Sequence, residues 1–331
     1  MAMIASGRKL WWALPLLLSV LPLAWRDSPT SLAWFDFCQK LFPRQPHTLP
    51  AVIVGIDEAS LARKGQWPWP RAQLAELVGR IGAARPAAIG LDLLFPEEDR
   101  YSPGRIASFF PELPRDLAAR LPDGDARLAA ALKRYPSVLG VAGLDAPSPM
   151  SRQGGPVTPA RVVGGLPRAV RAYPQALRSI PLLDRAAAGY AMLSVDPENG
   201  LVRRVPLVTL LAGQPMPGLP VELLRVASGE GAFRLESKDG RLWAVGGGEV
   251  DIPVAADGRF WVYFSPRLAE RFVSAADVLD GKVAPSALEG RLVLVGVTGL
   301  GMVDYVTTPV GERMPGVEVH AQVLENIFDG Q

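Results

Sequence analysis

The chain has 331 residues and a net charge of +2 at pH 7, which excludes the broad basic surface that nucleic-acid binding needs, so no nucleic-acid partner is expected. Its single cysteine, Cys38, excludes an intrachain disulfide framework and a multi-cysteine zinc site. The 33 glycines and 32 prolines favour a loop-rich α/β domain over a helical bundle.

An apolar segment at residues 10–25 is the first predicted element, and Arg8 and Lys9 precede it. Its tryptophans lie at both ends, where a membrane helix meets the lipid headgroups, and no small-residue cleavage site follows. We therefore expect one uncleaved transmembrane anchor at 10–25; a cleaved signal peptide and a buried soluble helix are the alternatives. The basic residues place residues 1–9 in the cytoplasm and the rest of the chain outside.

Residues 26–50 are predicted to form a short juxtamembrane helix and a linker. Residues 31–42 mix apolar and polar positions at helical spacing, with Leu32, Phe35 and Leu41 facing either the domain or the membrane surface. The prolines between residues 43 and 50 predict an extended linker into the first strand.

A βαβ unit opens the main domain, which is expected to span residues 51–331. Residues 51–56 are an apolar, mostly β-branched run and predict a buried strand. A helix that begins at Arg71 follows, with its apolar residues at helical spacing, and residues 87–95 predict a second buried strand. A strand, a helix and a strand with this pattern predict a mostly parallel sheet with flanking helices.

The later elements are expected to extend or decorate this sheet. Asn199-Gly200, the strongest short hairpin signal, should join strands at 189–195 and 202–211. Residues 233–254 alternate between apolar and polar positions and predict a small β-rich insertion. Further helices are expected at 123–134, 220–228, from 274 and at 315–328, further strands at 137–144, 259–264 and 291–297, and loops at 101–122, 145–165 and 298–314.

A candidate ligand site lies beyond the carboxyl ends of the predicted parallel strands, where ligands bind in open sheets of this kind. Six polar residues are expected at this edge: Asp57, Glu58, Arg71, Asp92, Asp304 and Thr308. Their carboxylates suit a divalent cation, which would bridge Asp57, Glu58 and Asp92. The alternative is structural, with Asp57 and Asp92 capping loops and pairing with Arg71. Apart from this cation, we expect no cofactor.

Three further groups have both a functional and a structural interpretation. Trp67 and Trp69 form either a wall for a ligand or partner subunit, or a rigid plug over the core. Arg203 and Arg204 either bind an anion or protect a strand edge. His320 is expected to be a buried structural histidine. No nucleophile has a histidine base at a recognisable motif spacing, and no phosphate-binding glycine loop follows the first strand, so no enzyme activity is expected.

Five separated motifs resemble the CHASE2 family, the second type of cyclase/histidine-kinase-associated sensory extracellular domain. In chain order they are VGIDEASL at 54–61 with WPWPR at 67–71, GLDLLF at 90–95, NGLVRRVPL at 199–207, VLVG at 293–296 with Asp304 and TTP at 307–309, and PGVEVHA at 315–321. Together they extend over nearly the whole chain, and they occur in the order of the family's motifs.

The resemblance implies an extracytoplasmic sensory domain without catalysis of its own, held in the bacterial inner membrane by a single N-terminal span. Such domains control a cytoplasmic output module: an adenylate or guanylate cyclase, a kinase or a diguanylate cyclase. The sequence ends at Gln331 before a second span, so we expect either a fragment or an output module on a partner protein. The expected partners are the membrane, an unknown small-molecule or protein signal, and a second copy in a homodimer.

Two other functions stay open at this point. One is a metal-dependent hydrolase that uses Asp57, Glu58 and Asp92. The other is a structural envelope or dimerisation module with Trp67 and Trp69 at its interface. The sensor hypothesis places a two-state switch in the final helix at 315–328, because that helix is the natural exit toward the membrane.

Overall fold

The structure is a computed structural model that describes residues 28–114, 116, 120–152, 154–299, 305–311 and 313–330. The predicted anchor at 10–25 lies outside the described residues, and so does Asp304. Within the described ranges, no helix is both long and apolar enough to cross a membrane.

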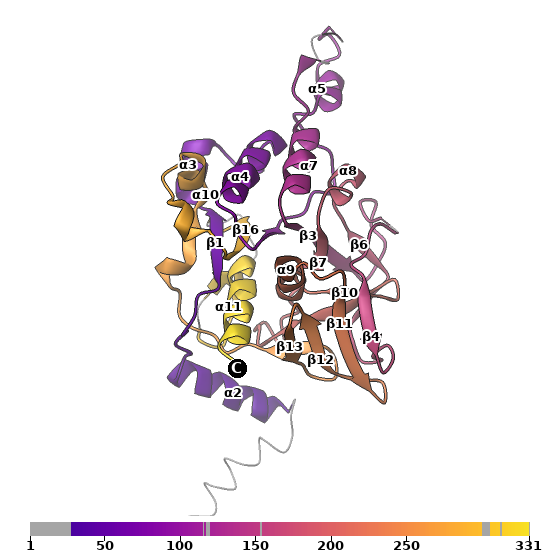
Figure 1. The fold of residues 1–331 in the computed structure, drawn as a ribbon, viewed down its shortest axis with the longest axis vertical. Coiled ribbons are helices and arrows are strands. Elements are labelled where there is room, and N and C mark those ends of the chain that lie inside the picture. Colours follow the sequence, from indigo (N-terminus) through magenta and orange to yellow (C-terminus); the bar gives the residue numbers. More distant parts are fainter. Residues whose placement is uncertain are drawn as a thin grey trace, which may run out of the picture.

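Among the described residues, a seven-stranded sheet forms the centre of the domain (Figure 1). Its strands lie in the order β15, β1, β16, β2 and β3, with β6 and β7 both paired to β3. All of these pairs are parallel except that of β3 with β6. The strands are β1 (Ala51–Ile56), β2 (Ala88–Asp92), β3 (Ser137–Leu144), β6 (Gln175–Leu177), β7 (Gly189–Met192), β15 (Phe272–Ser274) and β16 (Leu292–Val297).

Two helical layers cover this sheet, because each strand turns alternate side chains to opposite faces. Val52, Val54 and Ile56 of β1 point into the layer of α3, α4, α7, α8 and α10. Ala51 and Ile53 point into the layer of α9 and α11 (Figure 1). The helices are α3 (Glu58–Lys64), α4 (Arg71–Ala83), α7 (Gly124–Arg134), α8 (Pro181–Asp184), α9 (Leu219–Ser228), α10 (Ala275–Leu279) and α11 (Gly316–Phe328).

Smaller sheets extend the layer of α9 and α11. The predicted insertion at 233–254 is confirmed as an antiparallel sheet, and β4 adds to its edge in parallel. Its strands are β4 (Ala160–Val163), β11 (Phe233–Lys238), β12 (Arg241–Gly247) and β13 (Val250–Pro253). The other short strands are β5 (Ala172–Tyr173), β8 (Arg204–Pro206), β9 (Val208–Leu211), β10 (Gln214–Pro217), β14 (Arg259–Trp261), β17 (Tyr305–Thr307) and β18 (Arg313–Pro315).

Several local predictions are wrong. The expected hairpin does not form, since β7 pairs with β3, β8 pairs with β14, and β9 pairs with β5 and β10. Asn199 and Gly200 do make a tight turn with positive φ, but the turn fixes only the local backbone and not the partner of each strand. The three expected loops contain α5 (Pro103–Phe109), β4, and the paired strands β17 and β18.

The helix α2 (Pro29–Leu41) lies at one end of the molecule, beside the C-terminal end of α11, whereas α5 lies at the opposite end (Figure 1). Asp36 accepts two hydrogen bonds from Arg203, at 2.6 and 2.7 Å. The side chain of Gln39 donates to Val262 O at 2.9 Å and accepts from Phe264 N at 2.8 Å. These contacts fix the predicted juxtamembrane helix against the domain.

Candidate functional site

Asp57 and Asp92 lie at the carboxyl ends of their strands, and Asp57 has a structural role. Asp57 follows β1 and caps α3, because its Oδ1 accepts a hydrogen bond from Ser60 N at 2.8 Å. The same oxygen accepts a second hydrogen bond from Ser274 Oγ at 2.9 Å. Glu58 is exposed in the first turn of α3. Asp57 therefore holds together the ends of β1 and β15.

Asp92 ends β2 and lies against the start of α11. Its side chain makes no hydrogen bond or ion pair with any described residue, and a Cβ on Gly316 would stand 3.9 Å from its Oδ2. Burial raises the pKa of the Asp92 carboxyl to about 7. Its partial solvent contact and the amide groups at the start of α11 both limit this effect, since a helix N-terminus favours a negative charge. The predicted pairing with Arg71 is wrong.

The order of the strands keeps Asp57 and Asp92 apart. β16 lies between β1 and β2, and Gly55, Gly296 and Asp92 stand at one level across the three strands. Two strand spacings separate the backbones of β1 and β2 by about 10 Å, so the two carboxyl groups are not direct neighbours. No three His, Cys, Asp or Glu side chains of the described residues lie close enough together to hold a metal ion. This geometry does not support the bridging cation or the hydrolase that would use it.

Arg71 lies at the same edge and pairs with carboxylates that the sequence did not single out. Its backbone N–H donates to Asp99 Oδ2 at 2.8 Å, and its Nε lies 3.7 Å from Asp125 Oδ1. Its guanidinium lies over the Phe95 ring, 4.4 Å from the centroid. Burial lowers the pKa of Arg71 and raises the pKa of Asp125, and the opposite charge of each residue limits the shift of the other.

The tryptophan loop and Thr308 belong to the folded body. Trp69 is buried in the layer of α4, where its Nε1 donates to Gly65 O at 2.8 Å. Trp67 is partly buried beside it, with 6.4 Å between the ring centroids. This is the plug arrangement, and Trp69 offers almost no surface to a ligand or a second copy. Thr308 is buried after β17.

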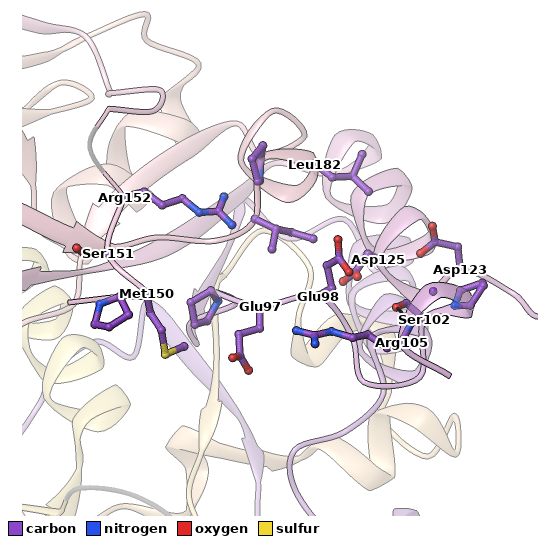
Figure 2. Close-up of a pocket in the computed structure, with 16 residues that line it drawn as sticks. Glu97, Glu98, Ser102, Arg105, Asp123, Asp125, Met150, Ser151, Arg152 and Leu182 are labelled. Atoms are coloured by element: carbon purple, nitrogen blue, oxygen red, sulfur yellow. Dashed lines mark hydrogen bonds between the residues drawn. The ribbon is translucent and has the colours of Figure 1, made fainter. Parts of the chain in front are cut away.

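A cavity of about 680 Å³, lined by both polar and apolar side chains, opens beyond the carboxyl ends of β2 and β3 (Figure 2). Its walls come from the segments that follow β2 and β3 and from the starts of α5, α7 and α8. Met150 and Arg152 lie on one side of the cavity, and Ser102 and Arg105 lie on the other (Figure 2). None of the five predicted residues that the structure describes lines it. Its charged residues are four carboxylates and two guanidinium groups: Glu97, Glu98, Asp123, Asp125, Arg105 and Arg152.

A second polar feature runs along α11, and we call it the α11 stripe. It consists of four residues spaced by four, three and four positions, which share one side of the helix: Glu318, Gln322, Glu325 and Asp329. The fully buried Arg271 joins two of them, with Nη1 2.7 Å from Glu318 Oε1 and Nε 2.6 Å from Glu325 Oε1. The amide of Gln322 exchanges hydrogen bonds with the backbone of Ser265. Burial raises the pKa of Glu318, and the charge of Arg271 opposes that shift.

The linker before β1 joins the far end of the α11 stripe. Arg44 pairs with Glu325 and, at 2.8 Å, with Asp329. Asp329 also accepts hydrogen bonds from Thr48 N and Oγ1, at 3.1 and 2.8 Å. Burial would raise the pKa of Asp329, but the hydrogen bonds from Thr48 and the charge of Arg44 outweigh it and hold the pKa below its usual value. The segment that follows the predicted anchor is thus bonded to the last helix.

Sequence reasoning missed the α11 stripe, although its signal was present. Polar residues recur at helical spacing in the predicted final helix, but acidic residues on one side of a helix ordinarily face solvent. Only the fold brings Arg271 and Arg44 to that side. His320 of the same helix is buried as predicted, and burial lowers its pKa to about 4. Arg203 and Arg204 are also buried, paired with Asp36 and Glu198, so the prediction of a strand-edge or anion-binding pair is wrong.

The comparisons with known proteins agree with the motifs. A family model described as the CHASE2 domain matches residues 12–331, which is essentially the whole chain. No curated protein and no solved structure matches the chain.

Proposed function

The chain belongs to the CHASE2 domain family, whose members are extracellular sensory domains, and we propose that it is the extracytoplasmic sensor of a bacterial transmembrane receptor. In this proposal, residues 10–25 anchor the chain in the inner membrane and residues 51–331 stand in the periplasm. The output comes from a cytoplasmic cyclase, kinase or diguanylate cyclase. The domain binds a signal, catalyses no reaction and acts as a homodimer.

The main support for this proposal is the position of α11, which runs from the strand tips to the linker. The helix has 13 residues and is therefore about 20 Å long. It begins beside Asp92 at the strand tips and ends beside Arg44 in the linker. The linker follows the proposed anchor, so a shift of α11 would act directly on the segment nearest the membrane. Packed interfaces of this kind switch between discrete arrangements rather than deforming continuously.

We place the signal in the cavity of Figure 2. The end of β2 joins this cavity to α11, because Asp92 lies against Gly316, while Glu97 and Glu98 follow shortly after and line the cavity. An excess of carboxylates suits a small polar molecule that carries an amine, and Arg152 would bind an acidic group on the same molecule. A ligand that moves the segment after β2 would therefore change how β2 meets α11.

A topology reporter tests the location. Alkaline phosphatase, which is active only after export, is fused to Gln331 of the full chain and expressed in bacteria. We expect phosphatase activity from this fusion and no fluorescence from a matched fusion to green fluorescent protein. If the green fluorescent protein fusion were fluorescent and the phosphatase fusion inactive, the periplasmic location would be contradicted.

A ligand screen tests the sensing role. Amino acids and small amines are screened by thermal shift, and we expect a compound that stabilises the protein but has no effect on the Glu97→Gln, Glu98→Gln variant. Glu249→Gln, an exposed change in the turn before β13, is the matched control. Hydrogen exchange of residues 316–330 should change when the compound binds. Unchanged exchange there would reject the role of α11, and turnover of the compound would reject a purely sensory function.

A further inference from the structure

The helix α2 turns several of its large apolar side chains away from the protein, which is unusual for a surface helix. Four large apolar residues in and after this helix are widely exposed: Trp34 (45%), Phe37 (53%), Leu41 (54%) and Phe42 (79%). The rings of Trp34 and Phe37 lie 5.7 Å apart, so they form one continuous surface. The polar side chains of Asp36 and Gln39 face the domain instead.

The contacts on the inner side of α2 fix this orientation. Asp36 holds its two hydrogen bonds to the buried Arg203, and Gln39 holds the two backbone contacts described above. Phe35 packs against Trp261, with 4.6 Å between the ring centroids. The helix cannot roll over and bury its aromatic side without breaking these bonds, so the exposed face is a built feature of the domain.

The chain before α2 indicates what covers this face. Only residues 26–28 separate the predicted anchor at 10–25 from Pro29, and four Cα steps span at most about 14 Å. An anchored chain therefore holds α2 within that distance of the bilayer. Tryptophan and phenylalanine on one side of a helix, with a basic residue such as Lys40 nearby, are typical of helices that lie in the membrane interface.

A second copy of the chain fits this face less well. Large aromatic side chains contribute about 150–250 Å² each, so even at that size the exposed parts of the four amount to roughly 350–580 Å². A stable protein interface needs about 800 Å² from each partner. We infer that α2 lies along the outer surface of the lipid bilayer, with Trp34, Phe37, Leu41 and Phe42 among the lipid headgroups. This inference rests on the anchor in the proposed function and adds a second membrane contact, which Asp36 joins to the domain.

The single cysteine of the chain allows a direct test in the full-length protein. In a Cys38→Ser background, one new cysteine is introduced by Phe37→Cys or Phe42→Cys, and by Phe109→Cys as the matched control. Phe109 is an exposed aromatic residue on α5, at the opposite end of the molecule (Figure 1). Each cysteine carries an environment-sensitive fluorophore, and each protein is inserted, domain outward, into vesicles of phosphatidylethanolamine and phosphatidylglycerol. Unchanged melting temperatures show that the variants fold.

Two quenchers then report what surrounds each fluorophore. We expect a spin label near the headgroup end of the lipid chain to quench positions 37 and 42 several-fold more than position 109, and aqueous iodide to show the reverse. Equal iodide quenching at all three positions overturns the inference. Protection of positions 37 and 42 from both quenchers also overturns it, because a second copy then covers the face. Protein that does not float with the vesicles overturns the anchor as well, whereas floating protein with iodide quenching overturns the inference alone.

Discussion

Removal of Arg271 is the strictest test of the α11 stripe. Arg271→Met keeps much of the side-chain volume, but it leaves Glu318 without a salt bridge, with only the charge of Arg267 and the amide of Gln322 still favouring its carboxylate, and it leaves Glu325 with Arg44 alone. Arg271 and both glutamates are fully buried, so water cannot replace the lost charge. Breaking a buried ion pair by removing one partner costs about 3–5 kcal/mol. We expect a loss of that size in the free energy of unfolding at pH 8.

The loss should depend on pH and should be reversible by a second substitution. Without Arg271, burial holds the folded-state pKa of Glu318 above its unfolded value, so protonation relieves the unpaired charge as the pH falls. The part of the deficit that comes from Glu318 is therefore full above its folded-state pKa and is relieved below the unfolded pKa of about 4.3. Adding Glu318→Gln should restore most of the stability at pH 8, because a neutral amide needs no opposite charge.

Urea-induced unfolding, followed by near-ultraviolet circular dichroism at pH 5 and pH 8, measures these free energies. Arg80→Met is the matched control, because Arg80 and Glu76 form an exposed pair one turn apart in α4. Such pairs contribute less than about 0.5 kcal/mol. If Arg271→Met cost no more than this control, or if Glu318→Gln restored nothing, the buried pairing would be refuted.

Two further predictions concern the strand tips and the tryptophan plug. Asp92→Asn should stabilise the protein by about 2–3 kcal/mol at pH 8 and not at pH 4. Because burial raises the pKa of Asp92 to about 7, the folded protein loses stability as the pH rises from about 4 to 7 and the carboxyl ionises. The pKa shift corresponds to about 4 kcal/mol, which the N-terminus of α11 reduces. Equal urea midpoints for both proteins at pH 8 would contradict this. Trp69→Ala should cost about 3–5 kcal/mol and the partly exposed Trp67→Ala less than half of that; equal losses on thermal unfolding would rule out the plug.

The pattern of apolar residues along the sequence was enough to predict the strands that are buried on both faces and the helix with a long apolar side. The bounds of β1, β16 and α11 agree with the sequence prediction within one residue at each end. The order of the strands could not be predicted in this way, because each strand chooses its neighbour through packing with distant residues. β16 comes near the end of the chain and inserts between β1 and β2. That insertion alone separates Asp57 from Asp92 and divides the predicted site.

The arginines after the Asn199-Gly200 turn show the same limit. The turn itself was predictable, because Asn and Gly readily adopt the positive φ that the structure shows at both positions. The burial of Arg203 was not, because its partner Asp36 lies 167 positions earlier in α2. An arginine on a short strand ordinarily indicates an exposed edge, and only the docking of α2 covers this one. The cavity of Figure 2 was equally hidden, since two of its walls fall in segments that read as loops.

The helix α9 covers the same face of the sheet as α11 and also carries buried charges, so it is a natural comparison. Glu222 and Arg225 of α9 pair with each other at 2.7 Å. Glu222 also accepts hydrogen bonds from Thr158 Oγ1 and Tyr190 N, at 2.8 and 3.2 Å. This network therefore closes inside the domain, between α9, β7 and the segment before β4. A displacement of α9 would disturb the core, but these contacts give it no path to the linker or to α2.

The network of α11 is built differently, and this difference supports the proposal that α11 is the switch. It passes from Glu318 through Arg271 and Glu325 to Arg44, which lies in the linker after α2. If α11 shifts, either Arg44 moves with it or Glu325 loses one of its two cationic partners. Since an unpaired buried charge costs several kcal/mol, movement of Arg44 and its linker is the response of lower energy. A signal that displaces α11 at the strand tips is therefore expected to move the linker that follows the proposed anchor.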